Sequence, residues 1–459
     1  MTSPKVWIVL LAASRIIFSG QTKQRMEYNF SSIEEAQRVL GYDGTFPGEI
    51  FSLTFFVPLC SLLIWLIAGI THLSNRSVQF LELCVLNVIL LLALTLLEEK
   101  LQLVLIGLGI LVSILFYVFV VKYFFKKSKY VLKDISLPER NVNRDFIGGY
   151  RGHLLLATAI SILAVDFNFF PSRFAKTETY GWSMMDAGVG SFILLHGLCS
   201  SHGKTFVVKH SLRKCFLSSF PLFLLGFIRL AATTAVICYS VLCKVRLPSG
   251  LLAALTVLIH QLLLSKAGLA DLVISESRGN FFEANKEGIC SLLGFVTLYF
   301  CGVQLGHIVL EARVKRKVSD YMWLLAKLIV IGAFAWTLMY PFHEEVQPVS
   351  RRMANLPYCI WVVALTSLQL AVHLCQEIIM TILSKVLKNN CEFLLWKAIN
   401  YNGLFYFLLA NLLTGLVNIS MNTDESSNLK SFIILVLYLT ILTVSSVVNI
   451  KFNIQLKFW

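Results

Sequence analysis

The feature that most constrains this chain is a series of apolar runs, each about as long as a membrane-crossing helix and separated by short polar segments. Inside a bilayer only helices and closed barrels satisfy all their backbone hydrogen bonds, and a helix needs about 20 apolar residues to cross. The sequence therefore predicts an all-α, polytopic integral membrane helix bundle with about 12–13 transmembrane helices. The runs cover residues 50–71, 79–97, 101–125, 147–167, 182–200, 216–243, 250–265, 289–310, 322–342, 356–383, 403–421 and 431–448.

Composition supports the membrane assignment and excludes other classes of protein. Hydrophobic residues make up 57% of the chain and charged residues only 14%, so a soluble domain of this composition would expose large apolar patches. The formal net charge is +14, but the basic residues are spread through the loops and do not form one basic domain. We therefore expect membrane lipid around the protein and no nucleic acid partner.

The distribution of basic residues predicts the orientation, because Lys and Arg are enriched in cytosolic loops. The loop 122–151 is the most basic and is assigned to the cytosol, whereas the segment 422–428 is acidic and is assigned to the other side. The remaining basic segments should lie on the same side as the loop 122–151. They are 204–214, 313–317, 385–397 and the tail with Lys451 and Lys457.

Counting the crossings exposes an inconsistency. Three runs lie between residues 214 and 313, although both of these positions are assigned to the cytosol. The run 216–243 is unusually long and carries Arg229 in its middle. It is therefore interpreted as a broken or hairpin element, or as the place where one crossing is missing.

The first 49 residues form an N-terminal segment that crossing parity assigns to the lumen, and residues 50–459 are expected to form one multi-spanning domain. The apolar stretch 6–13 is too short to cross, so a cleaved signal peptide and a peripheral start both remain open. The sequon at Asn29 is predicted to be glycosylated, whereas those at Asn75 and Asn418 are not.

The cysteine pattern and the motifs narrow the chemistry. Most of the 11 cysteines lie inside apolar runs, where they are expected to be small buried side chains. The sequence has no CxxC pair, HExxH motif, Walker loop or GxSxG elbow. We therefore expect no metal site and no bound cofactor.

Four polar islands interrupt the apolar pattern and are the candidate functional regions. The first extends from Asp166 to Asp186 and also contains Arg173, Lys176 and Glu178. Ionisable groups at the edge of a span need a partner or a wet cavity, so this island is the main candidate for the chemistry. The alternative is an interfacial loop whose charges extend to the headgroups.

The second island covers residues 278–288 and contains Asn285 and Lys286 as candidate substrate-binding residues; the alternative is helix capping. The third covers residues 348–356, where Arg351 and Arg352 break the basic-inside pattern. Guanidinium groups form bidentate bonds with phosphate, so the pair suggests a lipid phosphate site, although extension to headgroups explains it equally well.

The fourth island covers residues 400–418. Asn411, Thr414 and Asn418 follow spacings of three and four, so they lie on one helix face. That face contacts either a substrate or a neighbouring helix through hydrogen bonds.

At these islands the chain resembles a known family, the glucosaminyl-phosphatidylinositol inositol acyltransferases of glycosylphosphatidylinositol (GPI) anchor synthesis, called PIG-W in animals and Gwt in fungi. The resemblance extends from about residue 140 to residue 418. It rests on DFNFFPSRFAKTETYGWSMMDAGVGSF from Asp166, RGNFFEANKEGI from Arg278, SRRMANLPYCIWVVA from Ser350 and NGLFYFLLANLLTGLVN from Asn402.

The resemblance implies transfer of a fatty acyl group, usually palmitoyl, from acyl-CoA to an inositol hydroxyl of glucosaminyl-phosphatidylinositol in the endoplasmic reticulum membrane. Acyl-CoA is then a co-substrate. Asp166 is suited to be the general base, and Lys176 to stabilise the thioester oxyanion or hold the base. The residues expected to bind substrate are Arg173, Glu178, Asp186, Asn285, Lys286, Arg351, Arg352 and Asn411.

Two departures from the family pattern are visible. Between Arg229 and Leu251 the chain lacks the acidic, aromatic and histidine-containing stretch that the family leads us to expect, and Trp182 stands where the family tends to have a small residue. An inactive variant that lacks one span is therefore an alternative. A lipid or solute transporter is another, and it predicts polar islands near the bilayer midplane, whereas an acyltransferase predicts that the islands meet at one cavity.

Overall fold

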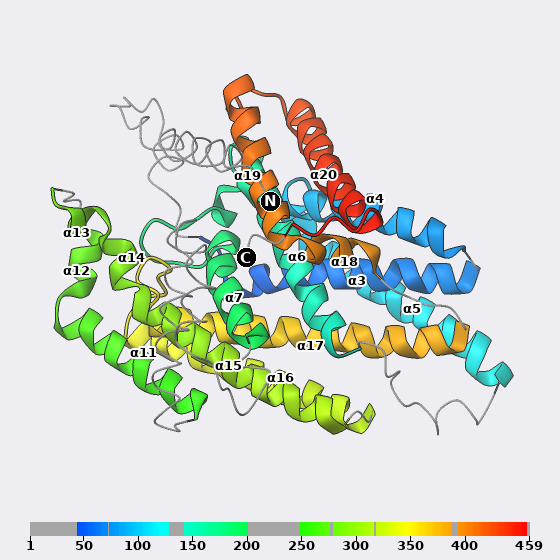
Figure 1. Ribbon diagram of the computed structural model, residues 1–459, viewed down its shortest axis with the longest axis horizontal. Helices are drawn as coiled ribbons and strands as arrows, with labels where there is room; N and C mark the ends of the chain where they lie inside the picture. Colours follow the sequence, from blue (N-terminus) through cyan, green and yellow to red (C-terminus); the bar gives the residue numbers. More distant parts are fainter. Residues whose placement is uncertain are drawn as a thin grey trace.

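The computed structural model describes residues 44–71, 73–127, 142–200, 248–275, 279–315, 318–387 and 393–456, which form a helix bundle (Figure 1). Among these residues, 10 helices are long and apolar enough to cross a membrane, judged by length and composition. They are α3 (Pro47–Thr71), α4 (Asn75–Leu94), α5 (Leu101–Lys127), α6 (Val142–Ala164), α11 (Ser249–Lys266), α15 (Leu292–Lys315), α16 (Val318–Glu345), α17 (Leu356–Leu387), α19 (Gly403–Ser420) and α20 (Asn428–Lys451).

The predicted fold class is confirmed, since each of these helices coincides with a predicted run to within a few residues. The predicted run 182–200 is helix α7 (Met184–Cys199), which is apolar but shorter than the others. The run 216–243, with Arg229, lies outside the described residues, as does the sequon at Asn29.

Shorter helices that hydrophobicity does not reveal occur between the spans. They are η1 (Glu98–Lys100), η2 (Ser172–Phe174), α12 (Leu269–Ile274), α13 (Phe281–Ala284), α14 (Lys286–Cys290) and α18 (Leu394–Tyr401). Helix α18 begins where the buried Glu82 carboxylate of α4 accepts hydrogen bonds from the Leu394 and Leu395 backbone N–H groups. A carboxylate at a helix N-terminus satisfies donors that have no partner within the helix.

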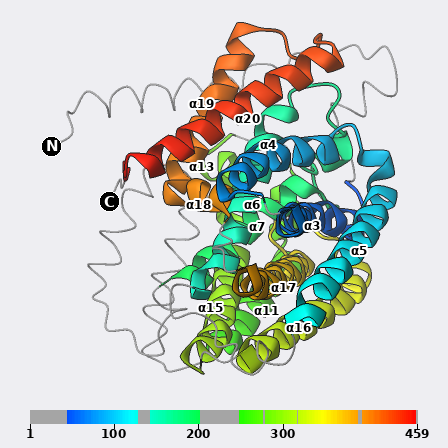
Figure 2. The same cartoon turned by 90° about the vertical axis from the view of Figure 1, so that its right-hand side faces the viewer.

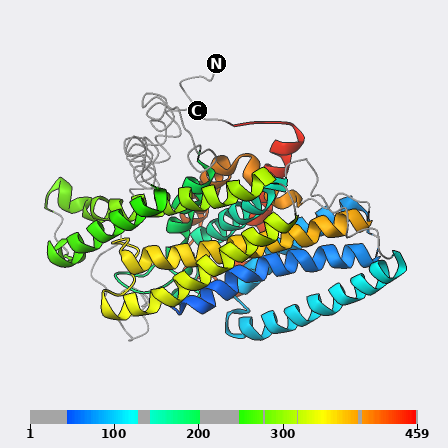
Figure 3. The same ribbon diagram turned by 90° about the horizontal axis from the view of Figure 1, so that it is seen from below.

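Helix α17 is the centre of the bundle. It lies beside α3 and α16 in both Figures 1 and 3, and it also packs against α6 and α7. Gln369 and Gln376 of α17 donate hydrogen bonds to Thr54 and Ser61 of α3, which satisfies polar groups in the apolar interior. Helix α5 lies at the outside of the bundle (Figure 3), and only 11% of its apolar window is buried, so it presents an apolar face for lipid.

The packing of α7 against α15 depends on two glycines. A Cβ atom at Gly197 would collide with the Tyr299 carbonyl of α15, and one at Gly302 would collide with the Leu194 carbonyl of α7. Small residues let membrane helices approach closely, and here they fix the position of α7 in the core. The start of α7, where the first polar island ends, is therefore held on a rigid element.

Contacts between distant segments define two ends of the bundle. At one end Lys122 Nζ donates to the Ile70 carbonyl, Asn400 to the Gly148 carbonyl and Asn402 to the Ile454 carbonyl. The described parts of the basic segments gather at this end, as the orientation argument requires. At the other end lie the loop 165–183, the segment 346–355 and the turn between α19 and α20, which is seen beside α20 in Figure 2.

The helices α11 and α15 are antiparallel, because Ser249 contacts Gln304 and Thr256 contacts Thr297. Together they cross the membrane twice and return the chain to the side on which α11 begins. The uneven number of crossings between residues 214 and 313 therefore comes from the run 216–243, which lies outside the described residues.

The end that carries the basic segments is predicted to face the cytosol. A protease site inserted after Val131, in the most basic loop, should be cleaved in sealed microsomes, and one inserted in the acidic turn at Glu425 should be protected. Protection of the first site with cleavage of the second would reverse the orientation of the whole bundle.

Candidate active site

The loop between α6 and α7, residues 165–183, carries most of the first polar island. Phe174 of η2 is fully buried and anchors the loop on the bundle. Gly181 has a φ of 124° and donates its backbone N–H to the Val349 carbonyl, so the loop crosses next to the segment before α17. A positive φ of this kind is readily adopted only by glycine. The first and third polar islands are thus joined through the backbone.

A network of four charged side chains connects three of the islands. Arg351 Nε lies 2.7 Å from Asp186 Oδ1, and Arg351 Nη1 lies 3.3 Å from Glu287 Oε1. Arg352 Nε lies 3.2 Å from Glu287 Oε2, so Glu287 bridges both arginines. The second island, in α14, is therefore joined to the start of α7 and to the segment before α17.

Asp186 is completely buried and lies in the first turn of α7. Ser183 caps this helix by accepting the Asp186 backbone N–H. Asp186 Oδ2 accepts hydrogen bonds from the backbone N–H and the hydroxyl of Thr177, at 3.1 and 2.7 Å. The Tyr358 hydroxyl of α17 donates to the Asp186 carbonyl at 2.9 Å and accepts the Gly190 N–H. One residue thus links α7, the loop and α17.

Lys176 lies beside this network, where its side chain is partly surrounded by protein and partly open to solvent. Desolvation and the nearby Arg351 guanidinium lower the pKa of Lys176, while the Asp186 and Glu287 carboxylates oppose the shift. Among the described residues Lys176 Nζ has no hydrogen-bond partner. Its ammonium is therefore available to an anionic group of a substrate.

Asp166, at the other end of the same loop, has different neighbours. Asn418 Nδ2 donates to Asp166 Oδ2 at 2.9 Å, and Asp424 lies nearby. Partial burial raises the pKa of Asp166, the hydrogen bond from Asn418 opposes this shift and the Asp424 charge adds to it. The sequence left open whether Lys176 stabilises the oxyanion or holds Asp166. The structure gives Asp166 a partner in Asn418, near the turn between α19 and α20, and places Lys176 beside the arginine network.

Arg173 and Glu178 have different surroundings from the rest of the first island. Arg173 forms ion pairs with Glu49 at 3.0 Å and Glu98 at 2.7 Å, which tie the loop to α3 and η1. The Glu178 side chain is exposed, and its backbone carbonyl accepts a hydrogen bond from Arg352 Nη1. Arg173 therefore holds the loop in place at some distance from the arginine network.

The other predicted substrate-binding residues are found in three places. Asn285 is the N-cap residue of α14, and the adjacent Lys286 is buried and bonded to Ser275. Asn411 donates to the Phe407 carbonyl one turn earlier in α19. Of the fourth island, Asn418 reaches Asp166, whereas Asn400 and Asn402 lie at the opposite end of the bundle. The first three islands lie together at one end of the bundle. The fourth contacts them through the hydrogen bond from Asn418 to Asp166.

Sequence reasoning missed the roles of Glu287 and Tyr358. Glu287 lies in the second island, for which helix capping was the alternative, and Tyr358 lies in an apolar run. Nothing in the sequence around either residue indicates what it contacts. For Asp186 there was such a signal: the pattern Ser183-x-x-Asp186 at the start of an apolar run is typical of a capped helix N-terminus.

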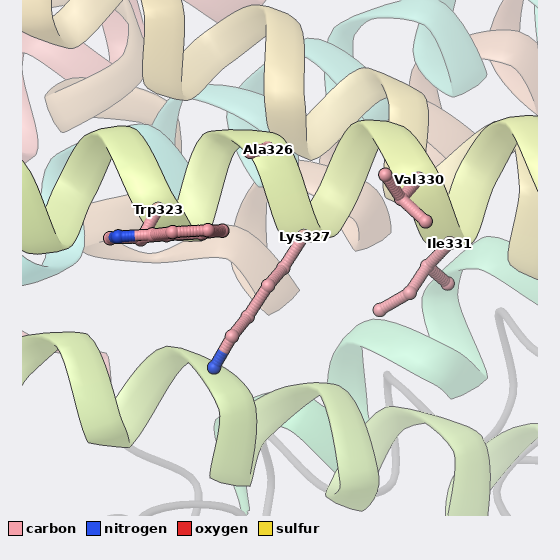
Figure 4. Close-up of a pocket in the computed structure, with 5 residues that line it drawn as sticks. All are labelled: Trp323, Ala326, Lys327, Val330 and Ile331. Carbon is pink, nitrogen blue, oxygen red and sulfur yellow. The ribbon is translucent and has the colours of Figure 1, made fainter.

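The described residues contain no group of three or more His, Cys, Asp or Glu side chains placed to hold a metal ion. A hollow of about 300 Å³ lies on the side of α16, lined by Trp323, Ala326, Lys327, Val330 and Ile331 (Figure 4). Lys327 pairs there with Glu311 at 3.0 Å. The hollow contains no member of the four islands, so it is not the candidate active site.

Comparison with known proteins gives a consistent result. A family model described as GWT1 matches residues 33–241 and 233–449, so the match divides in the region that departs from the family pattern. A GPI-anchored wall transfer protein 1 from Yarrowia lipolytica is 31% identical over 71% of this chain and 76% of its own length. A glucosaminyl-phosphatidylinositol-acyltransferase PIGW from Mus musculus is 31% identical over 66% of this chain and 72% of its own. A phosphatidylinositol-glycan biosynthesis class W protein from Dictyostelium discoideum is 27% identical over 74% of this chain and 80% of its own.

Proposed function

The chain belongs to the GWT1 family, and on that premise we propose that it transfers a fatty acyl group to the inositol ring of glucosaminyl-phosphatidylinositol in GPI-anchor synthesis. The mouse relative is named as an acyltransferase of this lipid. We further propose that acyl-CoA is the acyl donor, that no cofactor is bound, and that the protein acts in the endoplasmic reticulum membrane.

The observation that carries the proposal is the meeting of three polar islands at one end of the bundle, through Asp186, Arg351 and Glu287. A transporter is expected to hold its polar residues near the bilayer midplane, between two halves of the molecule. Here the network lies in the first turn of α7, in α14 just before α15, and in the segment before α17, at the level of the helix ends. That level suits a lipid headgroup, which carries both the inositol ring and the phosphate.

The reaction requires attack of an inositol hydroxyl on the thioester carbonyl. A new O–C bond forms, the C–S bond breaks, and the hydroxyl proton ends on the CoA thiol. In our proposal the Asp166 carboxylate accepts the hydroxyl proton, because a carboxyl with a raised pKa is a better base near neutral pH. The Lys176 ammonium stabilises the oxyanion that develops on the thioester.

The lipid phosphate is assigned to Arg351. Its Nε and Nη1 atoms bind Asp186 and Glu287, and its Nη2 atom has no hydrogen-bond partner among the described residues. Arg352 has contacts at all three nitrogens: Glu287 at Nε, the Glu178 carbonyl at Nη1 and the Val273 carbonyl at Nη2. The sequence treats the two arginines as equivalent, whereas the structure favours Arg351 as the phosphate ligand.

Arg351→Ala should therefore raise the apparent KM for the phosphoinositide by about tenfold or more, with a smaller effect on the KM for acyl-CoA. Arg352→Ala should change the lipid KM less, because all three of its guanidinium nitrogens already contact groups of the protein. Initial rates with each substrate varied in turn measure both constants. Equal effects of Arg351→Ala on the two substrates would remove the phosphate assignment.

The overall activity is tested by inositol acylation in acyltransferase-deficient microsomes supplied with labelled palmitoyl-CoA. The full chain should form the labelled, acylated lipid, and the mouse relative serves as a positive control. A chain that is present in the membrane at a matched level but forms no product would support the alternative of an inactive variant, because its sequence departs from the family between Arg229 and Leu251.

A further inference from the structure

The carboxylate of Asp186 is closed off from any substrate. Its side chain is only 1% exposed. One oxygen accepts Arg351 Nε, and the other accepts both the backbone N–H and the hydroxyl of Thr177. A buried carboxylate that already accepts three hydrogen bonds is well satisfied and has little capacity left for a ligand. Sequence reasoning grouped Asp186 with the substrate-binding residues, but this geometry gives it a different role.

The three bonds of Asp186 reach the neighbours of two proposed functional groups. Thr177 follows Lys176 directly in the chain, so fixing its backbone N–H fixes the backbone from which the Lys176 side chain extends. Fixing Arg351 Nε orients the planar guanidinium and therefore sets the direction of its Nη2 atom, which no described residue binds. Asp186 is in turn held by the Ser183 cap and by the Tyr358 hydroxyl. The site thus has a rigid support that comes from α7 and α17.

We propose that Asp186 is a positioning residue that orients Arg351 toward the lipid phosphate and Lys176 toward the reacting thioester, without touching either substrate. This proposal rests on the proposed function. Three cations (Lys176, Arg351 and Arg352) and two carboxylates (Asp186 and Glu287) meet here, so the cluster has one excess positive charge, which favours an anionic ligand. The Asp186 charge also offsets part of the repulsion between the neighbouring Lys176 and Arg351 cations.

Asp186→Asn tests this role because it keeps the shape and removes the charge. The apparent KM for the phosphoinositide should rise by about tenfold, with little change for acyl-CoA, because the partner that orients Arg351 loses its charge. The alkaline limb of the pH–kcat profile should also move to lower pH. The groups facing Lys176 are Arg351, which lowers its pKa, and Asp186 and Glu287, which raise it, so loss of the Asp186 charge lowers the pKa of Lys176 further.

Two further variants make the result decisive. Asp186→Glu restores the charge and should return the alkaline limb toward its original pH. Glu345→Gln, at an exposed carboxylate on the last turn of α16, should leave both KM values and the pH profile unchanged. An unchanged lipid KM and an unchanged alkaline limb in Asp186→Asn would overturn the proposal, even with the acyltransferase activity of the parent chain established.

If Asp186→Asn does not accumulate in the membrane, Thr177→Val takes its place. This change keeps the Asp186–Arg351 pair and removes only the hydroxyl bond that ties the loop to Asp186. It should lower kcat about threefold to tenfold, since one hydrogen bond is worth about 1 kcal/mol, and it should leave the lipid KM unchanged. A kcat equal to that of the parent chain, at matched protein level, would contradict the positioning of Lys176 by Asp186.

Discussion

Replacing Asp166 by Asn should reduce acyl transfer by a factor of about 10² to 10⁴, which is the usual contribution of a general base. Asn has nearly the same volume and can still pair with Asn418, so the loop should keep its conformation. The missing function is proton acceptance from the inositol hydroxyl. The rate of labelled inositol acylation, normalised to the amount of protein in the membrane, measures the effect.

The neighbouring Asp424 provides a matched control. It lies on the turn after α19 and its charge raises the pKa of Asp166. Asp424→Asn should therefore keep the maximal rate and move the acidic limb of the pH–rate profile to lower pH, because Asp166 then loses its proton more readily. Activity of Asp166→Asn within a few fold of the parent, at equal expression, would show that Asp166 is not the general base. Its role would then be structural, through the hydrogen bond to Asn418 of α19.

Lys176→Met should lower kcat by about 10² or more if the ammonium stabilises the thioester oxyanion. Met keeps most of the length of the side chain and removes the charge. The alkaline limb should disappear with it, since the parent enzyme loses activity as Lys176 loses its proton at a pKa below its ordinary value. Single-turnover rates at several pH values, with both substrates saturating, measure this step separately from binding.

Lys176→Arg separates charge from proton loss. Arginine stays charged across the accessible pH range, so this variant should keep part of the rate and extend activity to higher pH. A rate for Lys176→Met close to that of the parent would mean that the ammonium only extends to the headgroups. Lys176 would then not stabilise the oxyanion.

The helices were predictable from sequence because hydrophobicity over 20 residues is a local signal with a physical cause. Helix α18 was not, because its N-terminus is satisfied by Glu82, more than 300 residues earlier in the chain. Tertiary contacts of this kind leave no trace in the local pattern. Helix η2 likewise lies within a polar island and has no hydrophobic pattern of its own.

The sequence drew attention to Asp186, Arg351 and Arg352, but it did not predict how they pair, and it missed Glu287. A charge beside a span must have a partner, which is why Asp186 and Arg351 stand out in the sequence, but 165 residues separate them. The arginine pair breaks the basic-inside pattern, which predicted a lipid phosphate as its anionic partner. The anionic partners in the structure are the carboxylates of Asp186 and Glu287, and the lipid phosphate stays a prediction. Sequence alone gave no means of distinguishing Arg351, whose Nη2 atom has no hydrogen-bond partner in the described part of the chain, from Arg352.

The bond between Asp166 and Asn418 has a consequence for biosynthesis. These residues are 252 positions apart, and ribosomes add about 5–20 residues per second, so Asp166 reaches the membrane roughly 13 to 50 s before its partner is made. Arg351 likewise appears long after Asp186. Through that interval the nascent chain holds carboxylates without these partners next to apolar helices, and a premature stop codon shortly before α19 leaves a protein with most of its helices but an incomplete site.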